Sequence, residues 1–427
     1  MVESAYSEDA ARRAPSAAAD ALHVLLVDVS DRGGIARYTD CLGDALRAEG
    51  VTVSLAAPEG RSDRGLALAR RRWGPEVTGW ARQRLRARRL AEIVPSALLL
   101  GRAVVRAHPD VVHMQTEIVP PFDDLAVRAV ARRVPVVVTA HDPEPLDGGE
   151  RTLDRQARRW RSADAVIIHG EGQRELVERR APGVPVHVVP VDLPLGGPAL
   201  DAPAPGAPAP GGGAPGDPAS GGGASSRDEA RRTLGLDGAP TALLLGLLRP
   251  YKGIDLLAES WPAVVARVPG ARLLLVGEPY DCEEMDRLLR VPGVELRAGF
   301  IAEGDLNRWA AAADVMVLPY HRGSHSGILH RALAVSTPVL ASPSLADEVA
   351  RTGAGRVVEM DGAAWADALV AALTGPAPPA PPAPPLLTGR STALGTVAVY
   401  RDVLQRRARG HGARHQRAQR ATAGALS

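Results

Sequence analysis

Short apolar runs alternate along the chain with stretches whose apolar residues are spaced as on one face of a helix. The first run, at 22–28, leads into a glycine-containing loop at 29–34 and then into a helical segment that ends at Gly50. A second apolar run follows at once, at 51–58. A strand, a glycine loop, a helix and a strand in this order predict the opening of a doubly wound α/β sheet.

The alternation continues in two blocks of continuous apolar runs separated by helical segments. Such runs are typical of parallel sheets that helices cover on both faces. The first block adds strands at 110–115, 134–141, 163–170 and 184–191, and the second predicts strands at 241–248, 271–279, 294–301, 313–320 and 337–344. We therefore expect two Rossmann-like domains facing each other across a cleft, with ligands at the carboxyl ends of the strands.

Two tracts rich in proline and glycine interrupt this pattern, because they have no apolar face to bury. They predict a linker at 195–226 and a proline-rich insertion at 375–387. The rest of the chain then divides into a disordered leader at 1–20, an N-terminal domain at 21–194, a C-terminal domain at 227–374, a helix at 388–406 and a disordered basic tail at 407–427.

The composition excludes several classes of protein. Apolar residues make up 45% of the 427 residues, which is enough for buried cores, and a net charge of only +2 predicts no nucleic-acid partner. Cys41 and Cys282 fit no metal-ligand spacing, which favours ordinary thiols in a reducing compartment. The sequence shows neither a secretory signal nor a run of about 18 apolar residues. We therefore expect a cytoplasmic protein, at most peripheral on the inner face of the membrane.

The segment 246–255 carries the strongest chemical signal. It follows a predicted buried strand and holds Arg249 and Lys252 three residues apart, with Gly246 and Gly253 on either side. A planar guanidinium and a compact ammonium at the end of a strand suit a diphosphate. The alternative is an exposed loop with two surface charges, but the position at the expected ligand edge favours the diphosphate.

A second segment follows the predicted strand at 313–320 and opens a helix near Ile328. It contains Ser326 and Gly327 in a short turn. Free amide groups and the positive dipole end at a helix N-terminus attract anions. Taken alone, this turn would indicate a helix cap. Together with the cationic pair it predicts a second phosphate contact.

Three runs of the sequence resemble glycosyltransferase family 4, which has the GT-B fold. They are GLLRPYKGIDLLAESW from Gly246, LPYHRGSHSGILHRALAVSTPVLAS from Leu318 and GGIARYTDCLGDAL from Gly33. The resemblance covers most of 22–370 and the final helix. It implies a nucleotide-diphosphate-sugar donor, a glycan, lipid-linked or small-molecule acceptor, retention of anomeric configuration, and neither a cofactor nor a metal.

The resemblance also assigns roles to residues of the second domain. Arg249 and Lys252 match the cationic pair that binds the donor diphosphate and stabilises the departing nucleotide. Ser326, Gly327 and Ile328 match the turn whose amides contact the distal phosphate or the sugar.

Further residues are matched at the nucleobase and in the first domain. Phe300 and Ile301 fall where family members hold the nucleobase, and Gly33 and Gly34 match the glycine loop near the donor phosphates and the acceptor. His141 matches a histidine near the reacting sugar. A structural histidine at a strand end is an equally good interpretation of His141.

Three neighbouring polar residues bear on this question. Asp142 is a candidate to orient the His141 ring or to cap a helix. His113 and Gln115 end the neighbouring strand and are candidates to line the acceptor site.

One departure from the family pattern lies in the second domain. Many members carry two glutamates eight positions apart, and those positions hold Gly323 and Arg331 in this chain. A branch of the family with an S-G-V/I turn also lacks the first glutamate, and this chain resembles that branch. Because these glutamates would contact the donor sugar, their absence leaves the identity of that sugar open.

The segment 70–89 is rich in arginine and carries two tryptophans. One interpretation is a basic aromatic surface that rests on anionic lipid and collects a lipid-linked acceptor. The other is the solvated face of an amphipathic helix.

The sequence as a whole predicts a hexosyltransferase that uses a UDP- or GDP-sugar in glycan, glycolipid or natural-product biosynthesis. Two alternatives stay open. One is a catalytically inactive GT-B partner or regulator, which the loss of the glutamates suggests. The other is a nucleotide-sugar epimerase, which would alter the donor without an acceptor.

Overall fold

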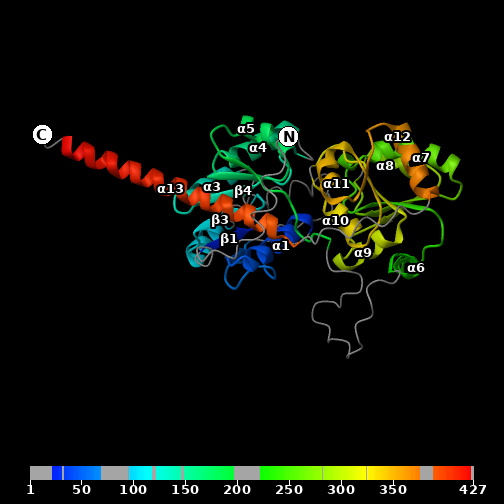
Figure 1. Cartoon of the computed structure of the whole chain (residues 1–427), viewed down its shortest axis with the longest axis horizontal. Helices are drawn as coiled ribbons and strands as arrows, with labels where there is room; N and C mark the ends of the chain where they lie inside the picture. Colours follow the sequence, from blue (N-terminus) through cyan, green and yellow to red (C-terminus); the bar gives the residue numbers. More distant parts are fainter. Residues whose placement is uncertain are drawn as a thin grey trace, which may run out of the picture. The chain divides into compact units, whose positions relative to one another are not determined.

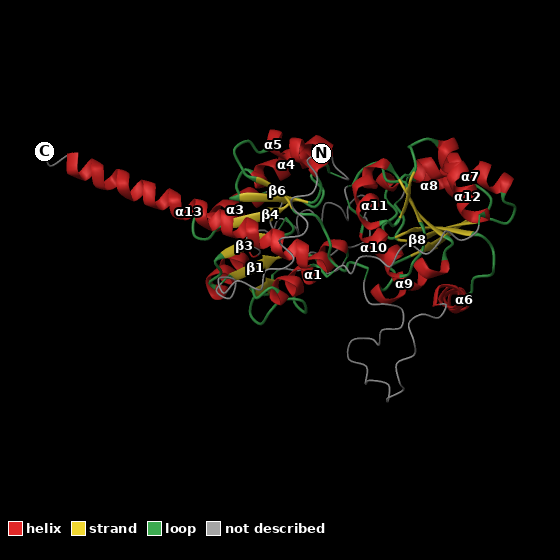
Figure 2. Ribbon diagram, in the orientation of Figure 1, coloured by secondary structure: helices red, strands yellow, loops and turns green. Residues whose placement is uncertain are grey.

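The computed structural model describes residues 22–30, 33–68, 95, 97–117, 122–145, 149–196, 222–280, 282–323, 325–375 and 388–424. The chain forms two compact units, residues 1–193 with 388–427 and residues 194–387. In each unit a central parallel sheet lies between helices (Figures 1 and 2). Each unit is described by itself below.

Unit 1 contains a six-stranded sheet in the order β2-β1-β3-β4-β5-β6. Every pair is parallel, so the carboxyl ends of all six strands lie at one edge. The strands are β1 (His23–Val27), β2 (Thr52–Ala56), β3 (Val111–Met114), β4 (Val136–Thr139), β5 (Ala165–Ile168) and β6 (Val186–Val188). The helices are α1 (Gly34–Ala48), a segment at 97–107, α3 (Asp123–Ala131), α4 (Gly149–Trp160), η2 (Glu171–Gln173), α5 (Arg174–Arg180) and α13 (Arg390–Gly424).

The two faces of this sheet pack differently. Val112 and Met114 of β3 join an apolar cluster with Leu100 of the helical segment 97–107 and Trp160 of α4. His113, between them, points the other way, and its Nδ1 lies 2.6 Å from the Tyr400 hydroxyl of α13. The period-2 alternation of a strand therefore separates an apolar face from a face with polar contacts to α13.

Unit 2 repeats the architecture with the strand order β12-β11-β10-β7-β8-β9, again all parallel. The strands are β7 (Thr241–Leu245), β8 (Arg272–Gly277), β9 (Val294–Ala298), β10 (Val315–Leu318), β11 (Val339–Ala341) and β12 (Gly355–Val357). The helices are α6 (Gly222–Leu234), η3 (Pro250–Lys252), α7 (Ile254–Arg267), α8 (Glu283–Leu289), α9 (Glu303–Ala312), α10 (Gly327–Ala334), η4 (Pro343–Leu345), α11 (Ala346–Thr352) and α12 (Gly362–Thr374). Trp261 and Trp365 fill the core between this sheet and its helices.

The prediction of two Rossmann-like sheets is confirmed, with strands that begin or end one to three residues inside the predicted runs. The sequence pattern missed β12, a three-residue edge strand without an apolar run. The predicted disordered tail at 407–427 was wrong for 407–424, because α13 continues to Gly424. Arginine, alanine and glutamine are good helix formers, so this stretch is helical without an apolar face of its own.

Two boundaries differ from the predicted domain limits. The helix α6 begins at Gly222, inside the range predicted as linker. The C-terminal helix α13 belongs to unit 1, where Arg407 donates to Asp164 at 2.8 Å and to the Ala131 carbonyl. The predicted leader at 1–20, the segment 70–89 and most of the two proline-rich tracts lie outside the described residues.

Candidate functional site

The loop after β7 contains a buried lysine, Lys252, whose ammonium lies next to Gly246. The Lys252 ammonium donates to the Leu245 carbonyl at 2.9 Å and lies 5.4 Å from the centre of the Tyr320 ring. Gly246 has a φ of +101°, and a Cβ there would lie 3.2 Å from Lys252 Nζ. A glycine is therefore needed at this position both for its backbone conformation and for the close approach of the ammonium.

Burial lowers the pKa of Lys252 from 10.5 to about 7. The cause is the loss of water around the charged ammonium, which its contact with a carbonyl only partly replaces. An anion brought against this amine would restore the charged form. Lys252 is therefore a candidate phosphate ligand.

Arg249 lies on the same loop, directly before η3. Its guanidinium carbon is 5.2 Å from the centre of the Tyr280 ring, which follows β8. The φ of Gly253, after η3, is +73°, and a Cβ there would lie 2.0 Å from the Pro319 carbonyl oxygen of the loop after β10. The loops after β7 and β10 are thus in direct backbone contact at the carboxyl edge of the sheet.

The turn after β10 forms the N-terminus of α10. Ser326 is the N-cap, and its hydroxyl accepts from the Leu329 amide at 3.4 Å. The Ser326 amide donates instead to a carboxylate oxygen of Glu348 at 2.7 Å. The amides of Gly327 and Ile328 belong to the first helical turn, which lacks intrahelical acceptors. These two amides, rather than that of Ser326, are the phosphate-binding candidates of this turn.

The structure brings this turn next to the cationic loop. A Cβ on Gly246 would lie 3.6 Å from the Ile328 side chain as well as 3.2 Å from Lys252 Nζ. The predicted residues Gly246, Lys252 and Ile328 therefore meet at one place, where the ends of β7 and β10 lie side by side.

Glu348 of α11 is a buried residue of this site that the sequence did not indicate. Its second oxygen lies 2.9 Å from His330 Nε2, and both side chains are almost fully buried. The carboxylate thus ties the start of α10 to its middle and fixes the turn at Ser326. Nothing in the sequence spacing indicates this pairing, because Glu348 lies 22 residues after Ser326.

The positions of the two family glutamates have a different structure in this chain. Gly323 adopts a φ of +125°, which disfavours side chains. Arg331 is buried and donates to Asn307 Oδ1 at 3.1 Å and to the Gly196 carbonyl at 3.3 Å. The arginine therefore anchors the start of the linker segment to α10 and α9.

The residues predicted at the nucleobase follow β9. Phe300 is 60% exposed, and Ile301 packs partly against the core of unit 2. Since β9 is the edge strand beside β8, both residues lie at the carboxyl edge, two strands from β7. An exposed aromatic ring at this edge is a candidate to stack on a base.

In unit 1, Gly33 precedes α1 with a φ of +92°, and among the described residues neither Gly33 nor Gly34 has a neighbour that would obstruct a Cβ. Gly33 is thus required for its backbone conformation rather than for space. Arg61 links the residues before and after this loop, because its guanidinium donates to the carbonyls of Ser30 and Ala36. It also pairs with Asp28, which is fully buried at the end of β1.

His141 lies at the end of β4 with both ring nitrogens near protein groups. Nε2 is 3.0 Å from Gln115 Oε1, and Nδ1 is 3.3 Å from His169 Nε2. His169 in turn donates from Nδ1 to the Val189 carbonyl at 3.0 Å. These contacts favour an orienting role for His141, and its predicted catalytic role stays a prediction.

The neighbours of His141 are also placed. His113 is fully buried between Tyr400 and Thr139, and burial lowers its pKa to about 3, so it is a neutral structural residue. Burial raises the pKa of Asp142 to about 6. Gln115 contacts the His141 ring directly.

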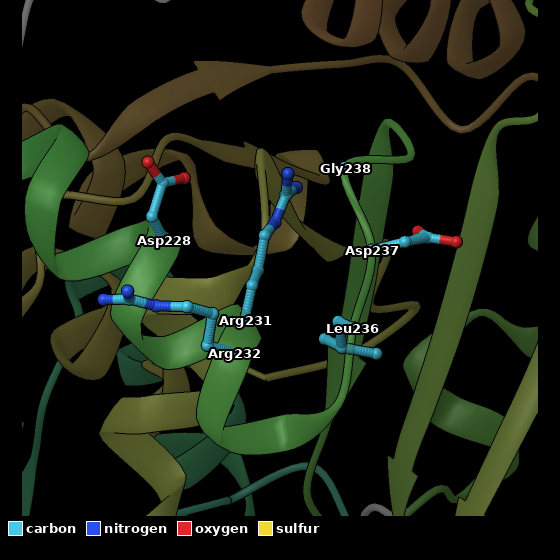
Figure 3. A pocket seen from close by; sticks show the side chains of 6 residues that line it. All are labelled: Asp228, Arg231, Arg232, Leu236, Asp237 and Gly238. Atoms are coloured by element: carbon cyan, nitrogen blue, oxygen red, sulfur yellow. The ribbon is translucent and has the colours of Figure 1, made fainter.

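A hollow of about 490 Å³ lies at another part of unit 2 (Figure 3). Its lining includes Arg231 and Arg232 of α6 and Leu236 to Gly238, which precede β7. It therefore opens at the amino edge of the sheet, opposite the residues described above. Arg231 is already paired with Asp314 at 2.8 Å. This hollow does not belong to the candidate site.

Two parallel six-stranded sheets of this kind in one chain are typical of the GT-B class. A sucrose-phosphate synthase from Thermosynechococcus elongatus aligns with a TM-score of 0.58 at 19% identity, covering 93% of this chain and all of that one. The Anabaena protein HepE, solved in complex with UDP and glucose, aligns with a TM-score of 0.54 at 16% identity, covering 92% of this chain and all of that one. At these identities the likeness concerns the fold.

The family follows from models that match the two halves of the chain. Residues 32–191 match Glycosyltransferase Family 4, and residues 239–375 match Glycosyl transferases group 1. The chain belongs to the family 4 type of GT-B glycosyltransferases.

Two curated relatives are similar over shorter segments. A GDP-mannose:glycolipid 4-beta-D-mannosyltransferase from Xanthomonas campestris pv. campestris is 32% identical over 32% of this chain and 42% of its own length. A phosphatidyl-myo-inositol mannosyltransferase from Mycolicibacterium smegmatis is 33% identical over 33% of this chain and 38% of its own length. The alignments thus span less than half the length of these relatives.

Proposed function

We propose that this chain moves a hexosyl unit from a nucleotide-diphosphate sugar to an acceptor hydroxyl. The observation that carries the proposal is the buried ammonium of Lys252, which contacts Gly246 at the end of β7 beside the first turn of α10. A buried cation with a lowered pKa is costly unless an anion reaches it. A diphosphate placed against Lys252 and Arg249 supplies that charge.

The donor is a GDP- or UDP-linked hexose. Relatives named for GDP-mannose and the UDP complex of a structural neighbour support these two nucleotides. The acceptor is a lipid-linked or inositol-type hydroxyl, which the names of the glycolipid and inositol transferases support. We infer that the protein works in the cytoplasm, at the inner face of the membrane when the acceptor is a lipid.

In the proposed reaction the bond between C1 of the sugar and the β-phosphate oxygen breaks. A bond from C1 to the acceptor oxygen forms with retention of configuration, and the acceptor proton passes to the departing diphosphate. Arg249 and Lys252 neutralise the charge that develops on that diphosphate, which is the role a divalent metal has in other transferases. The amides of Gly327 and Ile328 hold its distal oxygens.

The test measures binding and transfer in variants of the two cations. Arg249→Ala and Lys252→Ala should each reduce transfer from GDP-mannose or UDP-glucose about 100-fold or more, as removal of a charge-stabilising donor does. Arg267→Ala is the matched control. Arg267 is the last residue of α7, far from the candidate site, and forms an ion pair with Asp367 of α12. Normal transfer by a folded Arg249→Ala/Lys252→Ala protein would show that the assignment is wrong.

The replacement of the glutamates supports a second candidate, a GT-B protein that binds a nucleotide without transferring sugar. Arg331 is committed to Asn307 and Gly196, and Gly323 has no side chain. Calorimetry with GDP and UDP, followed by a transfer assay with the nucleotide-sugar that binds, separates the two candidates. Tight binding without turnover on lipid-linked or inositol acceptors would favour the second.

A further inference from the structure

The loops after β7 and β8 remain paired beyond the ends of their strands. The Gly246 amide donates to the Val276 carbonyl at 2.9 Å, and the Leu248 amide donates to the Glu278 carbonyl at 2.9 Å. The Tyr280 amide then donates to the Leu248 carbonyl at 3.1 Å. The same set of backbone hydrogen bonds therefore holds Leu248, directly before Arg249, and Tyr280.

Glycine makes this close pairing sterically feasible. A Cβ on Gly277 would lie 1.8 Å from the Gly246 carbonyl oxygen, and Gly277 has a φ of +138°. Leu248 and Pro279 form a further parallel bridge just beyond these glycines. The residues that follow the bridge on its two sides are Arg249 and Tyr280.

The Tyr280 ring lies under the Arg249 guanidinium, with 5.2 Å between the guanidinium carbon and the ring centre. A cation at this distance from an aromatic face is attracted by the ring quadrupole. An arginine side chain also loses rotamer freedom when a ligand orders it. A ring that already restrains the guanidinium in the unliganded protein lowers the conformational-entropy cost of binding the ligand.

We propose that Tyr280 is a positioning residue that orients Arg249 toward the diphosphate of the donor. The proposal rests on the proposed function for the ligand, but the contact with Arg249 and the paired loops are features of unit 2 itself. The ring, and not the hydroxyl, is the part of Tyr280 that acts. Its effect on nucleotide binding passes through Arg249.

A double-mutant cycle tests this dependence. Tyr280→Ala should weaken binding of GDP or UDP about threefold to thirtyfold, the range expected for a partly desolvated cation–π contact. In the Arg249→Ala background the same substitution should weaken binding less than twofold, because the group it orients is gone. Tyr280→Phe, which keeps the ring, should bind like the unmodified protein.

The transfer reaction adds a kinetic readout. Since Arg249 is assigned to the departing diphosphate, Tyr280→Ala should lower kcat as well as raise KM for the donor. Thermal unfolding of each variant checks that unit 2 is intact. An equal loss of affinity in both backgrounds, or a loss in Tyr280→Phe as large as in Tyr280→Ala, would overturn the positioning role.

A spectroscopic measurement on the nucleotide-free protein separates this inference from the proposed function. The Arg249 Nε–H resonance, assigned by its absence in Arg249→Ala, should be shifted by the ring current in the unmodified protein and in Tyr280→Phe. It should move to an ordinary arginine position in Tyr280→Ala. An unshifted resonance in the unmodified protein overturns the inference whatever nucleotide is bound, whereas unimpaired nucleotide binding by Arg249→Ala overturns the proposed function.

Discussion

If the proposed function is correct, Lys252 should make binding of the donor diphosphate depend on pH. In the unliganded protein burial lowers its pKa to about 7, whereas a bound diphosphate favours the ammonium. Binding above pH 7 must therefore take up a proton. The affinity should fall as the pH rises, because a growing fraction of the amine must be protonated before it can pair with the phosphate.

The size of the effect follows from that pKa. With a pKa of about 7, the protonated fraction of Lys252 in the unliganded protein is about one half at pH 7, about one tenth at pH 8 and about one hundredth at pH 9. The dissociation constant of GDP or UDP should rise about fivefold from pH 7 to pH 8 and about tenfold more by pH 9. At pH 8 each nucleotide bound should take up about 0.9 proton.

Isothermal titration calorimetry in buffers of different ionisation enthalpy measures both quantities. The terminal phosphate of the nucleotide has a pKa near 6, so its own titration adds little between pH 8 and pH 9. Lys252→Met is the control, since it should bind weakly, without pH dependence and without proton uptake. An affinity that stays constant from pH 7 to pH 9 in the unmodified protein, with no proton taken up, would refute the reasoning.

Three further substitutions test the scaffold. Arg331→Ala should lower the free energy of unfolding of unit 2 by about 1–3 kcal/mol, because Asn307 Oδ1 loses its buried donor; denaturant titration measures this, and an unchanged midpoint would show that the arginine is not an anchor. Arg61→Ala should destabilise unit 1 by about 3 kcal/mol, since it leaves the Asp28 carboxylate buried without its ion pair. The exposed Arg64, replaced by alanine, is its control, and equal effects of the two substitutions would contradict the assignment. Tyr400→Phe removes the hydrogen bond between α13 and His113 while keeping the ring contact. It should lower the stability of unit 1 by about 1 kcal/mol, read from thermal unfolding; no shift would mean that this hydrogen bond contributes nothing to the docking of α13.

The two sheets and the cationic loop could be predicted because their causes are local in sequence. Continuous apolar runs produce the buried strands, and glycine loops at their ends place Arg249, Lys252 and Gly33 at the carboxyl edges. The topology of a parallel α/β fold then determines which ends meet. The position of Lys252 beside the turn at Ile328 follows from this topology and is seen in the structure.

Other features depend on partners far away in the sequence. Glu348 reaches Ser326 across 22 residues, Tyr400 reaches His113 across 287, and Arg331 reaches Gly196 across 135.

The order of hydrophobic and polar residues alone therefore determined the fold class, the two sheets and the identity of the diphosphate-binding candidates. Only the tertiary structure decided that the Ser326 amide donates to Glu348 and that Arg331 donates to the Gly196 carbonyl. It also decided that Gln115 and His169 contact the His141 ring and that the Tyr280 ring lies against Arg249. The physical reason is that periodicity reports which face of an element is buried, whereas a hydrogen bond or a ring contact depends on the packing of elements that no local pattern specifies.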